Sequence, residues 1–84
     1  MATGTIRYWA AARAAAGVEQ ERYDAATLAD ALAAARRGRD ERFARLLAVC
    51  SILVEGEPVG AREHASVRLP EGVTIEVLPP FAGG

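Results

Sequence analysis

The chain has 84 residues and a formal net charge of −1, so it is long enough for one domain and carries no broad basic field for nucleic acid. Apolar residues make up 51% of it, which is enough for a packed core and argues against disorder. The single cysteine cannot form an internal disulfide, and the N-terminal stretch has no long apolar run. We therefore predict a cytoplasmic protein without a signal peptide or a membrane span.

The first predicted elements are a strand, a short helix and a second strand. The segment "TIRYW" at 5–9 is rich in β-branched and aromatic residues, and its alternation places Ile6 and Tyr8 on one face. The helix formers of "AAARAAA" at 10–16 stop at Gly17, a typical residue after a helix C-terminus. The polar segment "VEQERYD" that follows is typical of an edge strand.

Two longer helices are predicted next, because apolar residues recur at helical spacing. Thr27 with Asp30 three residues later resembles an N-terminal capping box, and Asp40 can cap the second helix. The two apolar stripes consist of Leu28, Ala31, Leu32 and Ala35, and of Phe43, Leu46, Leu47 and Cys50.

The second half of the chain is predicted to supply further strands. "SILVEGEPV" indicates a strand, a turn at Gly56 and a return that Pro58 limits. "VTIEVL" is the clearest strand, with Val73, Ile75 and Val77 on one face. Because no hairpin joins the first and last strands, we expect them to pair in parallel at the centre of the sheet. The order of elements predicts an α+β fold, a mixed sheet with helices on one face.

The interior of the sequence offers no candidate active site. His64 stands alone in a polar loop, where we expect a solvated side chain. Cys50 closes an apolar stripe without a neighbouring His or Lys that would lower its pKa, so we interpret it as a small core residue. No spacing of ligands suggests a metal site, and no glycine-rich phosphate loop is present.

The terminal segment "LPPFAGG" is the candidate functional region. Two prolines end the last strand and stiffen the exit, and the residues beyond Pro80 span at most about 13–14 Å when extended. A terminal carboxylate becomes a good electrophile once it is activated as an acyl-adenylate, and small residues can enter a narrow channel of another protein. We predict a domain at 1–78 and a flexible tail at 79–84, with Gly84 as the reacting residue. The predicted partner contacts are Pro80, Phe81, Ala82 and Gly83. A frayed, inert terminus is the alternative.

Two motifs carry a resemblance to a known family: "IRYWAAARAAAG" at 6–17 and "VLPPFAGG" at 77–84. Together with "VCSILVEGEPV", they resemble the ubiquitin-like β-grasp sulfur carriers of the MoaD/ThiS family, in particular the small subunit of molybdopterin synthase. Trp9 stands where a Phe is commoner, and the loop "LPEGV" lacks an Asp that many relatives have after the Gly. The resemblance implies a β-grasp fold with four to five strands.

The resemblance also implies a function and partners. An E1-like adenylating enzyme would activate Gly84 with ATP, and sulfur from a persulfide relay would yield a thiocarboxylate. The tail would then enter the large subunit of molybdopterin synthase and donate sulfur for the molybdenum cofactor. This chain would bind no cofactor and would not be an enzyme by itself. The alternatives are sulfur carriage for thiamine thiazole or cysteine, a protein-conjugating modifier, and a plain interaction domain.

Overall fold

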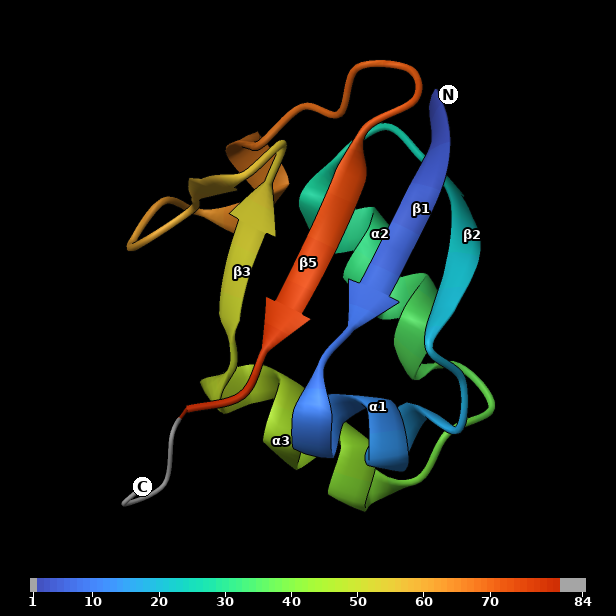
Figure 1. The fold of residues 1–84 in the computed structure, drawn as a ribbon. Helices are drawn as coiled ribbons and strands as arrows, with labels where there is room; N and C mark the ends of the chain where they lie inside the picture. Colours follow the sequence, from blue (N-terminus) through green and yellow to red (C-terminus); the bar gives the residue numbers. More distant parts are fainter. Residues whose placement is uncertain (1, 81–84) are drawn as a thin grey trace.

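The computed structural model describes residues 2–80, which build one five-stranded mixed sheet in the order β2-β1-β5-β3-β4 (Figure 1). The strands are β1 (Ala2–Tyr8), β2 (Gln20–Ala25), β3 (Ser51–Val54), β4 (Glu57–Pro58) and β5 (Thr74–Leu78). The helices are α1 (Ala10–Ala16), α2 (Leu28–Arg36), α3 (Glu41–Val49) and the 3-10 turn η1 (His64–Ser66). One face of the sheet carries the helices and the other is open (Figure 1). The predicted α+β fold is confirmed.

The centre of the sheet is the parallel pair β1 and β5, as the sequence predicts. Ile6 lies opposite Ile75, and Tyr8 lies opposite Val77. β2 pairs antiparallel with β1 and forms one edge, so the prediction of a polar edge strand is also confirmed. On the other side, β3 is antiparallel to β5, and the two-residue strand β4 ends at Pro58.

The helix boundaries follow the predicted caps. The Thr27 hydroxyl accepts a hydrogen bond from the Asp30 N–H at 3.3 Å, which begins α2. The Asp40 carboxylate accepts one from the Phe43 N–H at 3.0 Å, which begins α3. α1 ends at Gly17, whose φ of 83° is a left-handed conformation that glycine adopts without strain. Local signals therefore mark the starts of α2 and α3 and the end of α1.

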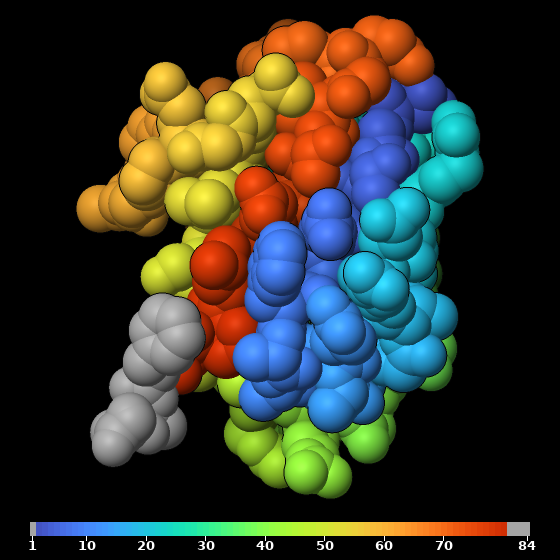
Figure 2. Space-filling view, in the orientation of Figure 1, coloured from blue at the N-terminus to red at the C-terminus, as the bar shows by residue number. Residues whose placement is uncertain are grey.

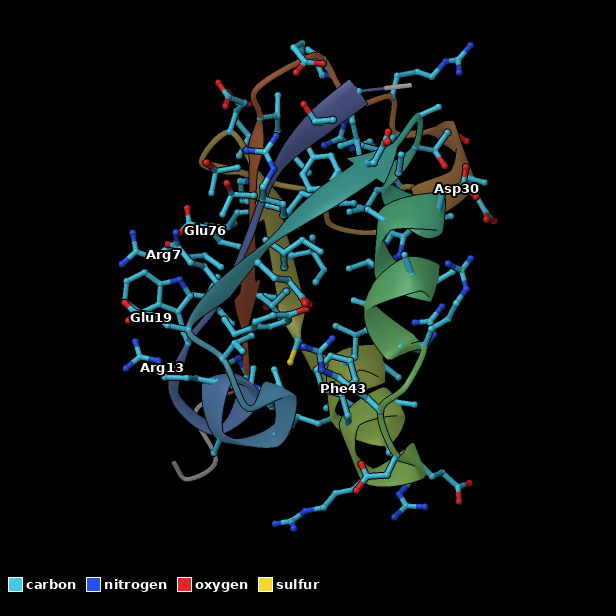
Figure 3. The ribbon with its side chains drawn as sticks, turned by 90° about the vertical axis from the view of Figure 1, so that its right-hand side faces the viewer. Arg7, Arg13, Glu19, Asp30, Phe43 and Glu76 are labelled. Carbon is cyan, nitrogen blue, oxygen red and sulfur yellow. The ribbon has the colours of Figure 1, made fainter. Side chains whose placement is uncertain are left out.

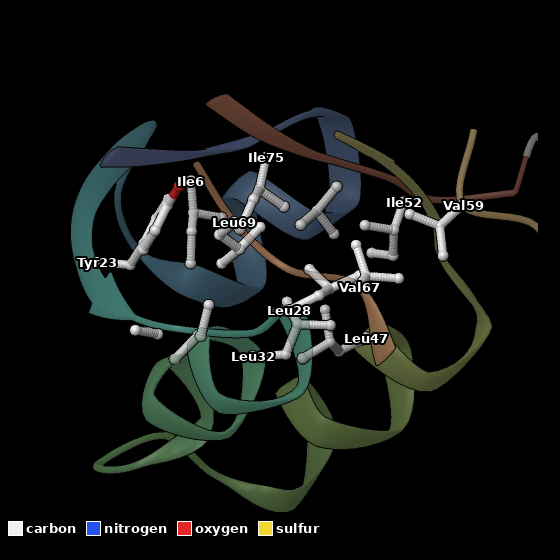
Figure 4. Close-up of a cluster of buried hydrophobic side chains, with 14 of the residues drawn as sticks. Ile6, Tyr23, Leu28, Leu32, Leu47, Ile52, Val59, Val67, Leu69 and Ile75 are labelled. Carbon is white, nitrogen blue, oxygen red and sulfur yellow. The ribbon is translucent and has the colours of Figure 1, made fainter. Parts of the chain in front are cut away.

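The core lies between the inner face of the sheet and α2 and α3 (Figure 4). Its inward-facing strand residues are Ile6, Tyr8, Tyr23, Ala25, Ile52, Ile75 and Val77. All four residues of the α2 stripe are buried, as the spacing predicts. In the second stripe Phe43 and Leu47 are buried, but Leu46 and Cys50 are only half-buried. The prediction that Cys50 closes a buried helical stripe is wrong in this respect, because α3 ends at Val49 and Cys50 follows in extended conformation.

A polar network that the sequence did not indicate ties three elements together. Arg39 donates to both carboxylate oxygens of Glu21 at 2.9 and 3.1 Å and to the carbonyls of Ala16 and Ala35 at 3.1 and 2.6 Å. Its guanidinium also lies over two aromatic rings, and the Tyr8 hydroxyl donates to Glu21 at 2.5 Å. Arg39 therefore closes the C-terminal ends of α1 and α2 and fixes them to β2.

Candidate functional site

The candidate site is the region where the chain leaves the sheet after β5. β5 ends at Leu78, Pro79 is half-buried and Pro80 is exposed. This end of β5 lies beside α1 (Figure 1). Of the predicted partner contacts, only Pro80 lies in the part of the chain that the structure describes. Phe81, Ala82, Gly83 and Gly84 lie outside the described residues, so their roles stay predictions.

A polar and aromatic cluster lies on the open face of the sheet beside this exit. Arg7 and Glu76 are direct neighbours in the β1–β5 register. The Trp9 Nε1–H donates to Glu76 Oε1 at 3.1 Å, and the Arg7 guanidinium lies over the Trp9 ring at 4.8 Å. The Trp9 backbone N–H donates to the Val77 carbonyl at 3.1 Å, which extends the pairing beyond β1. The indole is therefore held at the surface in one position by contacts from both central strands.

Half-buried apolar side chains continue this surface toward β3. Leu53 lies opposite Glu76, and Ser51 lies opposite Leu78. Since Leu53, Leu78 and Trp9 alternate with the buried residues of their segments, they belong to the open face. Figure 2 looks onto this face, where β1 and β5 run side by side toward the end of the described chain. We call the set Arg7, Trp9, Leu53, Glu76 and Leu78 the outer patch.

Exposed charges border the outer patch. Glu19 lies 3.8 Å from Arg7 and 3.9 Å from Arg13, with side chains that are 40–57% exposed. Figure 3 shows these three residues and Glu76 together on the side of the molecule away from α2 and α3. Exposed pairs at such distances contribute little to stability, at most about 1 kcal/mol each. These charges are therefore free to reorganise against another surface.

The described residues hold no obvious reactive group of their own. The Cys50 thiol donates to the Leu46 carbonyl at 3.2 Å, and burial raises its pKa, which keeps the thiol protonated. His64, which we expected to be solvated, is half-buried in η1. Within residues 2–80, no group of three or more His, Cys, Asp or Glu side chains is arranged to hold a metal ion. None of the helices described has the length and apolar character needed to cross a membrane.

Sequence reasoning missed the outer patch, although part of its signal was available. The alternation that buries Ile6 and Tyr8 sends Arg7 and Trp9 to the opposite face. What the alternation cannot show is the contact between Trp9 and Glu76, which are 67 residues apart. That contact depends on the parallel register of β1 and β5.

The sheet order, the parallel central pair and the helices on one face define a ubiquitin-like β-grasp protein. A family model described as the ThiS family matches residues 6–84. The chain therefore belongs to the ThiS family, and it is a protein of the ubiquitin-like sulfur-carrier type. No curated protein matches it in sequence.

Solved structures support the same fold. SAMP1 from Haloferax volcanii matches with a TM-score of 0.79 at 22% identity, over 98% of this chain and 99% of that one. The small archaeal modifier protein 1 from Methanosarcina acetivorans matches with a TM-score of 0.76 at 21% identity, over 100% and 98%. A chain from the complex of subunits 1 and 2 of the molybdopterin-converting factor from Helicobacter pylori matches with a TM-score of 0.69 at 23% identity, over 98% and 99%.

Proposed function

We propose that this chain carries sulfur as a thiocarboxylate on Gly84 and donates it to a molybdopterin precursor, as the small subunit of molybdopterin synthase. The observation that carries the proposal is the family match, which extends through the C-terminal Gly83 and Gly84 of the sequence. The Helicobacter pylori complex of two subunits supports a large subunit as the partner.

The chemistry that loads sulfur onto Gly84 proceeds in three steps outside this domain. The Gly84 carboxylate attacks the α-phosphorus of ATP in an E1-like adenylating enzyme, and pyrophosphate leaves. A persulfide sulfur then displaces AMP from the acyl-adenylate, and a thiol releases the thiocarboxylate by reducing the sulfur–sulfur bond. Gly84 has no Cβ that would hinder attack on its carbonyl. The acids, bases and oxyanion donors belong to the partner enzymes, so this chain is a co-substrate that is recharged after each turn.

The outer patch is the surface that the partner covers while the tail lies in its channel. The residues beyond Pro80 reach at most about 13–14 Å, so an enzyme that acts on Gly84 must approach the end of β5 closely. The outer patch borders that end, and Trp9 presents a large ring that is already held in place by Arg7 and Glu76. An aromatic side chain fixed before binding loses little entropy on docking, which is typical of residues that dominate interface energy.

A second candidate function is conjugation of Gly84 to lysine side chains of other proteins. The specific observation in its favour is the similarity to two small archaeal modifier proteins. Both functions share adenylation of the terminal glycine and differ in the nucleophile that follows. Sulfur carriage for thiamine thiazole or cysteine differs only in the acceptor.

Mass spectrometry of the intact protein separates these functions. The chain is incubated with an E1-like enzyme, ATP and a sulfur donor, and then with the large subunit and the pterin precursor. Sulfur carriage predicts a mass increase equal to the replacement of one oxygen by one sulfur, which is lost when the precursor is added. A ladder of high-mass conjugates without the sulfur adduct would instead identify a modifier. A stable adduct that the precursor does not discharge would indicate another acceptor.

A further inference from the structure

The outer edge of β2 has backbone groups that no strand of the described chain pairs. β2 is the first strand in the sheet order, with β1 on its inner side. The Tyr8 N–H donates to the Glu19 carbonyl at 2.9 Å, so the odd-numbered residues of β2 direct their backbone groups toward β1. The N–H and C=O groups of Gln20, Arg22 and Asp24 consequently point away from the sheet. This edge can accept another strand.

The side chains at this edge leave room for such a strand. Arg22 and Asp24 are exposed on the open face, and neither forms an ion pair within residues 2–80. On the helix side, a groove between β2 and α2 is lined by Ala31, Ala34 and Ala35, so no long side chain of α2 covers it. Figure 3 looks at this edge of the sheet, with β2 to the left of α2.

Charge is distributed unevenly along the edge. Asp24 lies at the end of β2 from which α2 begins, and Asp30 lies in the first turn of that helix. The other end of α2 carries the exposed Arg36 and lies near the start of β2, where Arg39 binds Glu21. Because Glu21 neutralises Arg39 and the exposed Glu19 directly precedes β2, the charge pattern that the edge strand itself offers is the alternation of Arg22 and Asp24.

We propose that the β2 edge is a self-complementary interface, at which a second copy of this chain adds its own β2 in antiparallel orientation. An antiparallel copy reverses the order of Arg22 and Asp24 along the edge, so opposite charges can face each other across the interface. A register centred on Tyr23 places Arg22 opposite Asp24 of the second copy, and by symmetry it does so twice. A pairing shifted to be centred on Arg22 would place this residue opposite Arg22 of the second copy. The repulsion between the two arginines disfavours that register.

This interface is separate from the proposed sulfur chemistry. The tail follows β5, and β1 lies between β5 and β2 in the sheet. In Figure 1 the chain leaves on the β3 side, opposite to β2. The dimer therefore keeps both tails available, and a monomeric variant is expected to accept sulfur as the wild type does.

Sedimentation velocity over a wide concentration series tests the interface. The wild-type chain should shift from its monomer mass of 8.9 kDa toward a dimer as concentration rises. Arg22→Asp and Asp24→Arg should each weaken the dimer about tenfold or more, because like charges then face each other twice. The double variant R22D/D24R restores opposite charges in this register and should recover most of the affinity. Arg45→Asp, on the exposed surface of α3, is the matched control and should change nothing.

A backbone variant tests the same edge without exchanging charges. Asp24→Pro removes a hydrogen-bond donor that points outward, and proline is tolerated on an edge strand, so the fold should persist while the dimer is lost. Circular dichroism and a melting curve verify the fold of each variant. The proposal is overturned if the wild type stays monomeric at all concentrations, or if the single charge exchanges leave a dimer unchanged. A double exchange that binds no better than the singles would overturn the register.

Discussion

The two faces of the central strands are stabilised by different kinds of interaction. Ile6 and Ile75 pair across β1 and β5 on the inner face, where they are 1% and 0% exposed. One residue further along the same strands, Arg7 and Glu76 pair on the outer face, where Trp9 is held by a hydrogen bond and a ring contact. The inner face is stabilised by burial, which any apolar side chain of suitable volume supplies. The outer face depends on particular partners, so its substitutions should affect binding more than folding.

The largest expected effect is on the inner face. Ile75→Ala removes a fully buried side chain and should lower the free energy of unfolding by about 2–5 kcal/mol. Its neighbour Thr74 lies on the outer face, so Thr74→Ala should change that free energy by less than about 0.5 kcal/mol. Urea unfolding of both variants measures the contrast. Equal losses in the two variants would remove the distinction between the faces.

Arg39 is expected to contribute almost as much as a core residue, although it is charged. Arg39→Ala leaves Glu21 and two helix-terminal carbonyls without their donor, so we expect a loss of about 2–3 kcal/mol. The Arg39 and Glu21 side chains are only 17% and 30% exposed, whereas Arg45 and Glu41 are 70% and 82% exposed. Arg45→Ala is therefore the control and should lose less than about 0.5 kcal/mol. Similar melting curves for the two variants would show that the Arg39 network does not contribute measurably to the stability of the fold.

Substitution of Trp9 should affect partner binding more than the stability of the fold. Trp9→Ala is expected to weaken binding of the large subunit about 10- to 100-fold, since anchored aromatic residues carry much of the energy of an interface. Trp9→Phe keeps a ring against Arg7 but loses the donor to Glu76, so its effect should be intermediate. Titration calorimetry gives the affinities, and urea unfolding gives the stability of the same proteins. A Trp9→Ala protein that binds normally but unfolds more easily would assign Trp9 to the fold.

The smallest predicted effect is a pH dependence from the Glu21 carboxyl. Burial favours its neutral form, but hydrogen bonds from Arg39 and Tyr8 outweigh burial and lower its pKa below 4.5. The unfolded chain therefore binds this proton first, so the stabilisation is complete above pH 4.5 and is lost as pH falls through the folded-state pKa. Glu21→Gln should reduce the decrease in unfolding free energy that occurs as pH falls below 4.5, and unfolding experiments at several pH values measure this decrease. An unchanged pH dependence of the unfolding free energy in Glu21→Gln would contradict the assignment.

The fold was predictable because each element carries its own local signal. Thr27, Asp40 and Gly17 mark helix boundaries within a few residues of sequence, and alternation identifies the inner face of β5. The Arg39 network was not predictable, because Arg39 and Glu21 lie 18 residues apart and meet only after α2 folds back along β2. The same applies to the outer patch. In the candidate site itself, the motif at the terminus indicated Gly84, and its role stays a prediction.

The central claim is that Gly84 is the residue that carries sulfur, and deletion of Gly84 tests it most directly. The variant and the wild type are incubated with the same activating enzyme, ATP and sulfur donor, and their intact masses are compared. We predict that the wild type gains the mass of one sulfur in place of one oxygen, whereas the deletion variant gains none and keeps its melting temperature. A variant with one extra residue after Gly84 should also remain uncharged. Equal incorporation of sulfur into the wild type and the deletion variant would contradict the claim.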